Sequence, residues 1–293
     1  MAEISASQVK ELREQTGAGM MECKNALKDS NGDMDKAIEW LRQKGLAAAA
    51  KKSSRAASEG LVVGKTSPCA KRAVLLEINC ETDFVAKNDK FQAFTQELAG
   101  IALDTRSQDA DALLAQAHGD KKVADYIASQ VATIGENIVL RRVTFMEISG
   151  EGIIGLYVHA LGGKMGALVA LESNKELACD EVAPVARDLA MHVVSAKPQF
   201  IQRTDIPEEQ IENERRIELG KEDLAKKPPE IREKIVTGRV DKIFAERCLL
   251  EQDFVKDPSQ KVSQVLSMKD KGIELKPKQF ALFILGENME AAE

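Results

Sequence analysis

The sequence is poor in the residue types that mark several classes of site. Aromatic residues make up 4% of the 293 residues, so few platforms exist for stacking nucleic-acid bases. The formal net charge of −6 disfavours general binding to phosphate backbones. The three histidines, His118, His159 and His192, have no helical metal-ligand spacing between them. We therefore expect no metal site, no cofactor and no direct contact with nucleic acid.

Cysteine pairs and long apolar runs are also missing. The five cysteines include no C-x-x-C pair and are odd in number, which is typical of free thiols in a reduced compartment. No apolar run reaches the length that spans a membrane, and residues 1–8 lack the basic-then-apolar pattern of a signal peptide. We expect a cytoplasmic protein, or one of an organelle matrix, that makes no membrane contact.

The first fifty residues predict a small bundle of three helices. Apolar residues recur at helical spacing, and glycines at 17 and 19 separate the first two helices. Methionines such as Met20 and Met21 more often fill gaps in an apolar core, and the alternative is that this pair forms a soft, adaptable contact surface. Residues 45–58 lose the apolar periodicity and gain small and basic residues, which predicts a linker that is helical at most in part.

A duplicated α+β core is predicted after the linker. Apolar runs at 60–66 and 73–78 indicate a β-hairpin, and helices and a further strand follow up to residue 148. The run from Gly60 to Thr66 is not a phosphate-binding loop, because only three residues separate its glycines and a turn follows it. Residues 151–155 and 169–174 repeat the hairpin pattern about ninety residues later.

The last third of the chain alternates charged helices with short apolar segments. Two helices around Lys226-Lys227-Pro228-Pro229 predict a protruding antiparallel hairpin, with Pro207 in the first turn of the first one. The second helix is expected to carry an apolar stripe formed by Ile231, Ile235, Val240, Ile243 and Phe244. A short helix at 262–268 and a last strand at 279–285 follow. The charges on the hairpin are most simply a solvated face.

The segment 79–88 places a large apolar side chain among acids and amides. Thr82 and Asp83 favour turn or cap geometry because their short polar side chains bond nearby backbone groups, so Phe84 is expected at an exposed corner. An isolated Phe more often folds onto its own core, and the alternative is a wedge that enters a pocket on another protein. The second copy of the hairpin has Lys175-Glu176-Leu177-Ala178 where the first has Glu81-Thr82-Asp83-Phe84, so the Phe-bearing loop is not repeated. This difference favours a task for Phe84 beyond folding.

Several long motifs, in order along nearly the whole chain, resemble the bacterial translation elongation factor Ts family. They are Val9-Lys10-Glu11-Leu12-Arg13, Thr16-Gly17-Ala18-Gly19-Met20-Met21, Asn79-Cys80, Thr82-Asp83-Phe84-Val85-Ala86-Lys87, Ile134-Gly135-Glu136-Asn137-Ile138, Arg141-Arg142-Val143, Ala190-Met191-His192-Val193 and Lys197-Pro198. The resemblance implies a guanine-nucleotide exchange factor, not an enzyme, that acts on the GTPase elongation factor Tu. Whether the chain forms a homodimer or a 2:2 complex with that GTPase stays open.

The resemblance also implies which residues bind the GTPase. The N-terminal bundle resembles a ubiquitin-associated domain and would use Lys10, Met20 and Met21. The loop would use Thr82, Asp83, Phe84 and Val85 beside the corner at Ile134 and Gly135, with Phe84 inserted between helices of the G domain near its Mg²⁺ and phosphate loop. The second core copy, with His159, would face the third domain of the GTPase. Read from the residues alone, two alternatives remain, a dimeric non-catalytic adaptor and a small enzyme using Asp83 and Lys87.

The predicted organisation has five parts. They are a helical docking domain with its linker at 1–54, a core N-subdomain at 55–149, a core C-subdomain at 150–202 completed by 252–285, an antiparallel coiled-coil hairpin at 203–251 and a C-terminal module at 258–293. Relatives in the family follow their last strand with another helix, whereas here only Met289 to Glu293 follow, so we expect that helix and its GTPase contacts to be missing.

Overall fold

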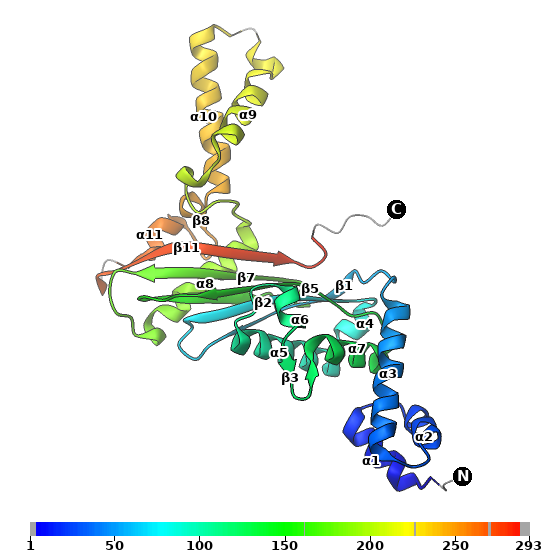
Figure 1. The fold of residues 1–293 in the computed structure, drawn as a ribbon. Coiled ribbons are helices and arrows are strands. Elements are labelled where there is room, and N and C mark those ends of the chain that lie inside the picture. The colour runs from blue at the N-terminus through cyan, green and yellow to red at the C-terminus, as the bar shows by residue number, and fades with distance from the viewer. Residues whose placement is uncertain (1–3, 161, 226, 269–270, 288–293) are drawn as a thin grey trace.

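The computed structural model describes residues 4–160, 162–225, 227–268 and 271–287. It has a central body of two β-sheets with helices, from which a helical head at the N-terminal end and a long helical hairpin project in opposite directions (Figure 1). The predicted α+β class is confirmed. The predicted absence of a C-terminal helix falls on residues 288–293, which lie outside the described residues.

The head consists of helices α1 (Ala6–Thr16), α2 (Met20–Asp29) and α3 (Met34–Lys52), as predicted. The Ser5 side chain caps α1, and Gly17 ends it with a φ of 67°, a left-handed conformation that glycine adopts without strain. A small apolar core holds the three helices together, formed by Val9, Leu12, Cys23, Ala26, Leu27 and Ala37.

The predicted linker at 45–58 is largely helical, because α3 continues to Lys52. Its alanine-rich sequence has high helix propensity, which outweighs the loss of apolar periodicity. The helix also packs against α7 (Val123–Ile134) in the core, and Arg42 forms an ion pair with Asp125 there at 2.7 Å. The head is therefore joined to the core by a continuous helix and not by a flexible tether.

The first sheet has the strand order β1-β2-β5, with β1 (Glu59–Thr66), β2 (Arg72–Cys80) and β5 (Val139–Glu147) all antiparallel. Helices α5 (Asp89–Thr105) and α7 cover one face with a large apolar cluster. The predicted hairpin, helices and third strand are confirmed. The smaller elements of this half are α4 (Asp83–Ala86), α6 (Ala110–Leu114), β3 (Ala117–His118) and β4 (Lys121–Lys122).

The second sheet repeats the plan, with the order β6-β7-β11-β10. Its hairpin, β6 (Gly152–Val158) and β7 (Met165–Ser173), lies where the internal repeat predicts it. Helix α8 (Cys179–Ala196) covers it so closely that a Cβ at Gly155 would lie 2.0 Å from the Ala186 carbonyl oxygen. The third strand β11 pairs with β7 as β5 pairs with β2, although it comes from the far end of the chain.

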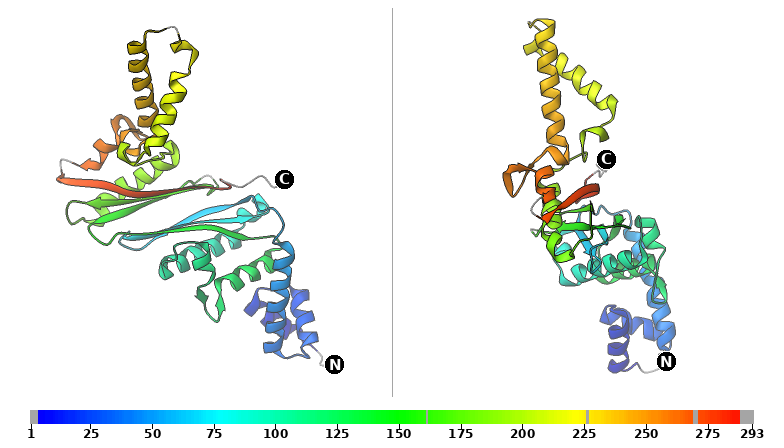
Figure 2. Two further views of the ribbon diagram at one scale, coloured as in Figure 1. Left: turned by 45° about the horizontal axis from the view of Figure 1, so that its top comes forward. Right: turned by 90° about the vertical axis from the view of Figure 1, so that its left-hand side faces the viewer.

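The two sheets stack face to face with helices on the outside, and their strands lie one above the other (Figure 2). Neighbouring residues along the strands point to opposite faces, so Leu75 and Ile154 lie between the sheets whereas Leu76 and Ile153 pack under the helices. This arrangement buries both faces of β2 and explains its continuous apolar run.

The projecting hairpin is formed by α9 (Glu208–Leu219) and α10 (Pro229–Arg247) around the predicted proline turn. Two details of the prediction are wrong. Ile231, expected on the apolar stripe of α10, is exposed because it lies in the first turn, where α9 does not cover it. The last strand begins at Ile273 and not at 279, since a register shift after Pro277 lets the strand pass through the proline.

The remaining elements are short. They are η1 (Arg203–Asp205), η2 (Glu222–Leu224), η3 (Leu249–Glu251), β8 (Asp253–Phe254), β9 (Asp257–Lys261), α11 (Val262–Leu266) and β10 (Ser267–Met268). The short helix predicted at 262–268 is thus present as α11, and its last two residues pair with β11 as β10. None of the helices among the described residues combines the length and apolar composition needed to cross a bilayer.

Candidate functional site

The segment around Phe84 is a single helical turn, α4, on the surface of the first sheet. Thr82 is its N-cap and accepts a hydrogen bond from the Val85 N–H at 3.3 Å. Val85 packs partly against the first core, whereas the Phe84 side chain is 82% exposed, the largest value among the exposed large hydrophobic residues of the described chain. The interpretation in which Phe84 folds onto its own core is wrong, because α4 turns it outward.

Asp83 and Lys87 form an ion pair at 2.7 Å beside Phe84. The hydrogen bond from Lys87 lowers the pKa of the Asp83 carboxyl, and the same bond raises the pKa of the Lys87 ammonium. Both shifts move the pKa away from neutral pH, so both groups stay charged there. An acid–base catalyst needs a pKa near the working pH, which this pair lacks. The geometry gives no support to the small-enzyme alternative.

The corner at Ile134 and Gly135 is connected to the start of α4 through the next residue, Glu136. Helix α7 ends at Gly135, which has a φ of 91° and so redirects the chain without strain. The next residue, Glu136, accepts hydrogen bonds from the backbone N–H groups of Glu81 and Thr82, both at 3.0 Å, and from the Thr82 hydroxyl at 2.6 Å. Its carboxylate therefore joins the corner to α4.

A second acidic side chain bridges the same two segments in the opposite direction. Glu81 accepts a hydrogen bond from the Asn137 backbone N–H at 2.6 Å and pairs with Arg55 at 3.5 Å. The buried Asn137 side chain donates to the Arg55 carbonyl at 2.8 Å. Sequence reasoning assigns no role to Glu81 or Glu136. The only signal is their position, because Glu136 lies inside the motif from Ile134 to Ile138 and Glu81 falls between the Asn79-Cys80 and Thr82 to Lys87 motifs.

His159 lies in the turn between β6 and β7 and is partly exposed. Its Nδ1 atom is 3.0 Å from the Tyr157 hydroxyl. The turn rests on β1, where the Val62 N–H donates to the Gly163 carbonyl at 2.7 Å. The second core copy therefore presents His159 beside the first sheet and not on a separate face.

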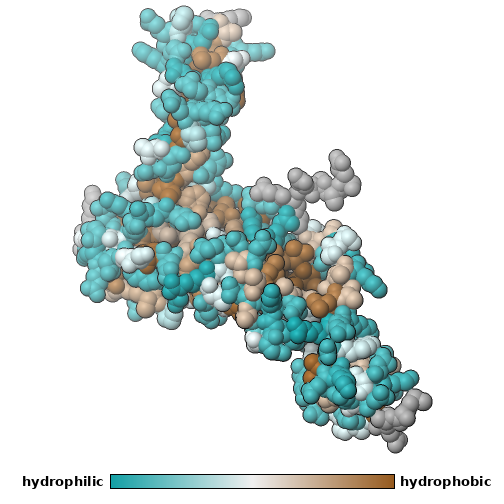
Figure 3. Space-filling model, in the orientation of Figure 1, coloured by the Kyte–Doolittle hydropathy of each residue, from teal (hydrophilic) through white to brown (hydrophobic). Residues whose placement is uncertain are grey.

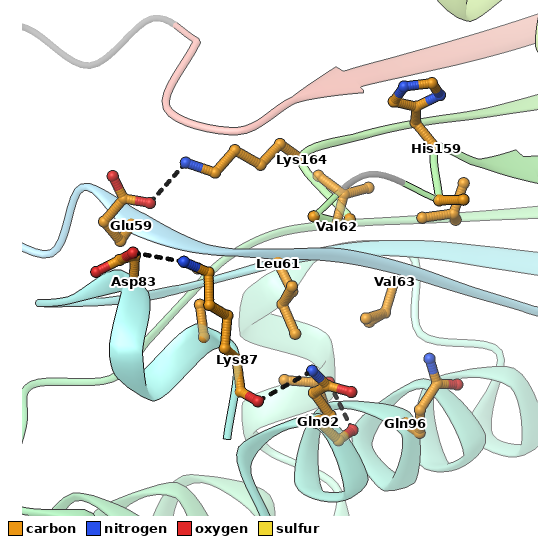
Figure 4. A pocket seen from close by; sticks show the side chains of 17 residues that line it. Glu59, Leu61, Val62, Val63, Asp83, Lys87, Gln92, Gln96, His159 and Lys164 are labelled. Atoms are coloured by element: carbon orange, nitrogen blue, oxygen red, sulfur yellow. Dashed lines mark hydrogen bonds and ion pairs between the residues drawn. The ribbon is translucent and has the colours of Figure 1, made fainter. Parts of the chain in front are cut away.

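A cleft of about 410 Å³ connects these two parts of the site. Its walls include Asp83 and Lys87 on one side and His159 on the other (Figure 4). Lys164 and Glu59 form an ion pair across it at 2.8 Å. Figure 3 shows the face of the molecule seen in Figure 1, where hydrophobic side chains gather on the core near β5. The structure thus places the Asp83 loop and the His159 turn on the walls of one cleft, and the bonds to Glu136 join that loop to the corner.

The predicted head residues form a separate surface. Met20 and Met21, in the first turn of α2, are 57% and 66% exposed, so the interpretation of this pair as core filler is wrong. Lys10 is exposed on α1, within 3.8 Å of Glu14. Across the described part of the chain, no hydrogen bond or ion pair connects these three residues to α4. They belong to α1 and α2, which lie in the head, apart from the core (Figure 1).

A metal centre finds no support in the described ranges, where no group of three or more His, Cys, Asp or Glu side chains is arranged to hold an ion. What the site offers instead is an exposed aromatic side chain, charged groups in fixed pairs, and soft apolar residues on the head. These are features of a surface that docks another protein.

Comparison with known proteins points to one family. A family model described as "Elongation factor TS" matches residues 81–287. The chain is similar to a protein named "Elongation factor Ts" from Magnetococcus marinus, with 45% identity over 99% of this chain and 95% of that protein. Proteins of the same name from Paramagnetospirillum magneticum and a Nostoc species are 46% and 43% identical, over 99% and 100% of this chain and 94% and 96% of theirs.

Proposed function

The chain belongs to the elongation factor Ts family of translation elongation factors, and on this premise we propose that it is a guanine-nucleotide exchange factor for elongation factor Tu. In this proposal the chain binds the GDP-loaded GTPase, promotes GDP release by disturbing its Mg²⁺ and phosphate region, and stabilises the nucleotide-free GTPase until GTP binds. The single observation that supports it most is the 82% exposure of Phe84 on a helical turn that the Glu136 carboxylate holds in place.

An exchange factor need not touch the nucleotide. It acts by binding the nucleotide-free GTPase more tightly than the loaded one. By thermodynamic linkage, GDP and the exchange factor weaken each other's affinity for the GTPase by the same factor. Each tenfold loss of GDP affinity requires about 1.4 kcal/mol of differential binding. Burial of one Phe supplies about 1.5 to 3 kcal/mol. Phe84 alone therefore accounts for one to two factors of ten, and a larger effect requires other contacts.

We assign those other contacts to the head and the second core copy. Met20 and Met21 would bury apolar area on the GTPase, and the turn of His159 would add contacts beyond the cleft. The continuous helix α3 supports this arrangement, because it holds the head at a defined place relative to α4. Binding by several rigid surfaces costs less ordering entropy than binding by flexible ones.

A nucleotide-release assay tests the proposal. Elongation factor Tu is loaded with fluorescent GDP, this protein is added with excess unlabelled GDP, and the fluorescence decay is followed. We expect faster release with the wild type, and a loss of about tenfold or more of the acceleration with Phe84→Ala. Val255→Ala, which trims another exposed apolar residue, is the matched control and should act as wild type. Unchanged release with the wild-type protein would rule the exchange function out.

A further inference from the structure

We propose that Glu136 and Glu81 are positioning residues for Phe84, and that together with Thr82 and Asn137 they form a carboxylate clamp. The clamp fixes α4 against the corner after α7, so that Phe84 projects outward before any partner is present. This inference deepens the proposed exchange function and rests on it.

Helix α4 cannot hold its own geometry. It has four residues, and the first hydrogen-bonded turn of a helix is the unfavourable nucleation step. The Thr82 cap supplies one hydrogen bond to Val85. The ion pair of Asp83 with Lys87 and the burial of Ala86 add to it, and the Glu136 carboxylate supplies the polar contacts that hold the base of the turn.

The Glu136 carboxylate binds the base of α4 through three donors. One oxygen accepts both backbone N–H groups, from Glu81 and Thr82, and the other accepts the Thr82 hydroxyl at 2.6 Å. Hydrogen bonds to an ionised acceptor are roughly twice as strong as neutral ones. Because the Thr82 hydroxyl donates to Glu136, its lone pairs remain directed to the Val85 N–H, so the clamp and the helix cap reinforce each other.

Glu81 closes the clamp from the segment that follows β2. Its side chain accepts the Asn137 N–H at 2.6 Å, while its own N–H donates to Glu136, so the two segments exchange bonds in both directions. Asn137 then extends the network to the segment that follows α3, through its bond to the Arg55 carbonyl. The clamp thus connects the Phe84 turn to the Ile134 corner and to the chain leading from the head.

Such preorganisation has a defined benefit for an exchange factor. If α4 had to be ordered during binding, part of the binding free energy of Phe84 would be spent on ordering it. A fixed turn allows all of that energy to act on the difference between loaded and nucleotide-free GTPase. The effect of Glu136 on exchange must therefore pass through Phe84.

A double-mutant cycle tests this dependence in the full chain. We compare wild type, Glu136→Ala, Glu136→Gln, Phe84→Ala and the Phe84→Ala/Glu136→Ala double variant in the nucleotide-release assay. The control is Glu147→Ala, which removes a surface ion pair with Arg106 on the same sheet. Initial rates are taken at saturating and at half-saturating concentrations, and the melting temperature of each variant is recorded.

We expect Glu136→Ala to lower the accelerated release rate about tenfold, and the double variant to be no slower than Phe84→Ala. Glu136→Gln should fall between wild type and alanine, because its amide oxygen still accepts the two N–H groups but its NH₂ cannot accept the Thr82 hydroxyl. If Glu136→Ala unfolds, this milder variant carries the test.

Two results would overturn the clamp. One is full activity of Glu136→Ala, and the other is additive loss in the double variant, which would mean that Glu136 acts independently of Phe84. Both are distinct from failure of the proposed function, in which the wild-type protein itself would not accelerate release.

Discussion

The Val62 N–H donates a hydrogen bond to the Gly163 carbonyl at 2.7 Å, and this bond fastens the turn that carries His159 to β1. Val62 belongs to the first core copy and Gly163 to the second. The contact therefore holds two parts of the predicted GTPase surface together, and Gly163 has a φ of 59°, which disfavours any other residue there.

Replacement of Gly163 tests this junction. In Gly163→Ala the left-handed backbone is strained and the new Cβ meets the Leu61 side chain at 3.1 Å, so we expect a loss of about 1 to 2 kcal/mol in the free energy of unfolding. Urea denaturation measures it. The control is Gly150→Ala, where no atom lies within 4 Å of the new Cβ. Equal stability of the two variants would contradict the role of Gly163 at this junction.

The ion pair of Glu77 and Arg142 connects the C-terminal end of β11 to the first sheet. Glu77 is fully buried, lies 2.7 Å from the Arg142 guanidinium and accepts the Gly286 N–H at 2.8 Å. Removal of Glu77 leaves the partly exposed Arg142 paired with Glu287 at 3.7 Å but takes the acceptor from the Gly286 N–H, so we expect Glu77→Ala to cost about 1 to 3 kcal/mol in urea denaturation. Lys278→Ala, which breaks the exposed pair with Glu172, should change stability little. A small loss for Glu77→Ala would show that the buried pair is dispensable.

The head surface is tested by Met21→Glu. A charge at this exposed position leaves the fold intact but opposes burial against a partner, so the concentration for half-maximal GDP release should rise about tenfold with an unchanged melting temperature. Glu39→Ala, on the exposed side of α3, serves as the control. Wild-type behaviour of Met21→Glu would remove the head methionines from the predicted interface.

The five free thiols should differ widely in reactivity. Burial raises the pKa of Cys80 to about 12, so at pH 8 about one molecule in ten thousand carries the thiolate there, whereas Cys69 is exposed. We expect iodoacetamide to label Cys69 first and Cys80 only after unfolding, as peptide mass spectrometry would show. In Cys69→Ser the fast phase should disappear. Early labelling of Cys80 in the folded protein would contradict its buried environment.

Protonation linked to His192 should lower the free energy of unfolding in mild acid. It is buried, its Nε2 lies 2.9 Å from the Gln252 amide oxygen and its Nδ1 accepts the Val255 N–H, which fits the neutral ring. Burial lowers the pKa of His192, so the unfolded state binds the proton first as pH falls below about 6.5. Stability should therefore be constant above that pH and decrease below it, by about 1.4 kcal/mol for every pH unit until the folded pKa is reached.

Urea denaturation between pH 5 and pH 8 gives this profile. His192→Gln should be less stable at pH 8 but show a flatter dependence, because the group that titrates is gone. A wild-type slope in His192→Gln would assign the acid sensitivity to other groups.

The sequence by itself determined the elements whose signals are local. Helix spacing and caps predict the head, the alternation of apolar residues predicts the strands, and the repeated pattern at 151–155 and 169–174 predicts the second hairpin. The polar residues around Phe84 also predict an exposed corner, since capping depends on residues only a few positions apart.

Tertiary structure decided what depends on contacts between distant residues. The bond between Thr82 and Glu136 spans 54 positions, and no local pattern reports it. Strand β11 pairs with β7 in a register set about a hundred residues along the chain, and α3 continues through the first part of the predicted linker because its alanine-rich segment finds α7 to pack on. Side-chain burial is a property of the assembled surface, which is why only the folded chain establishes that Phe84, Met20 and Met21 face outward.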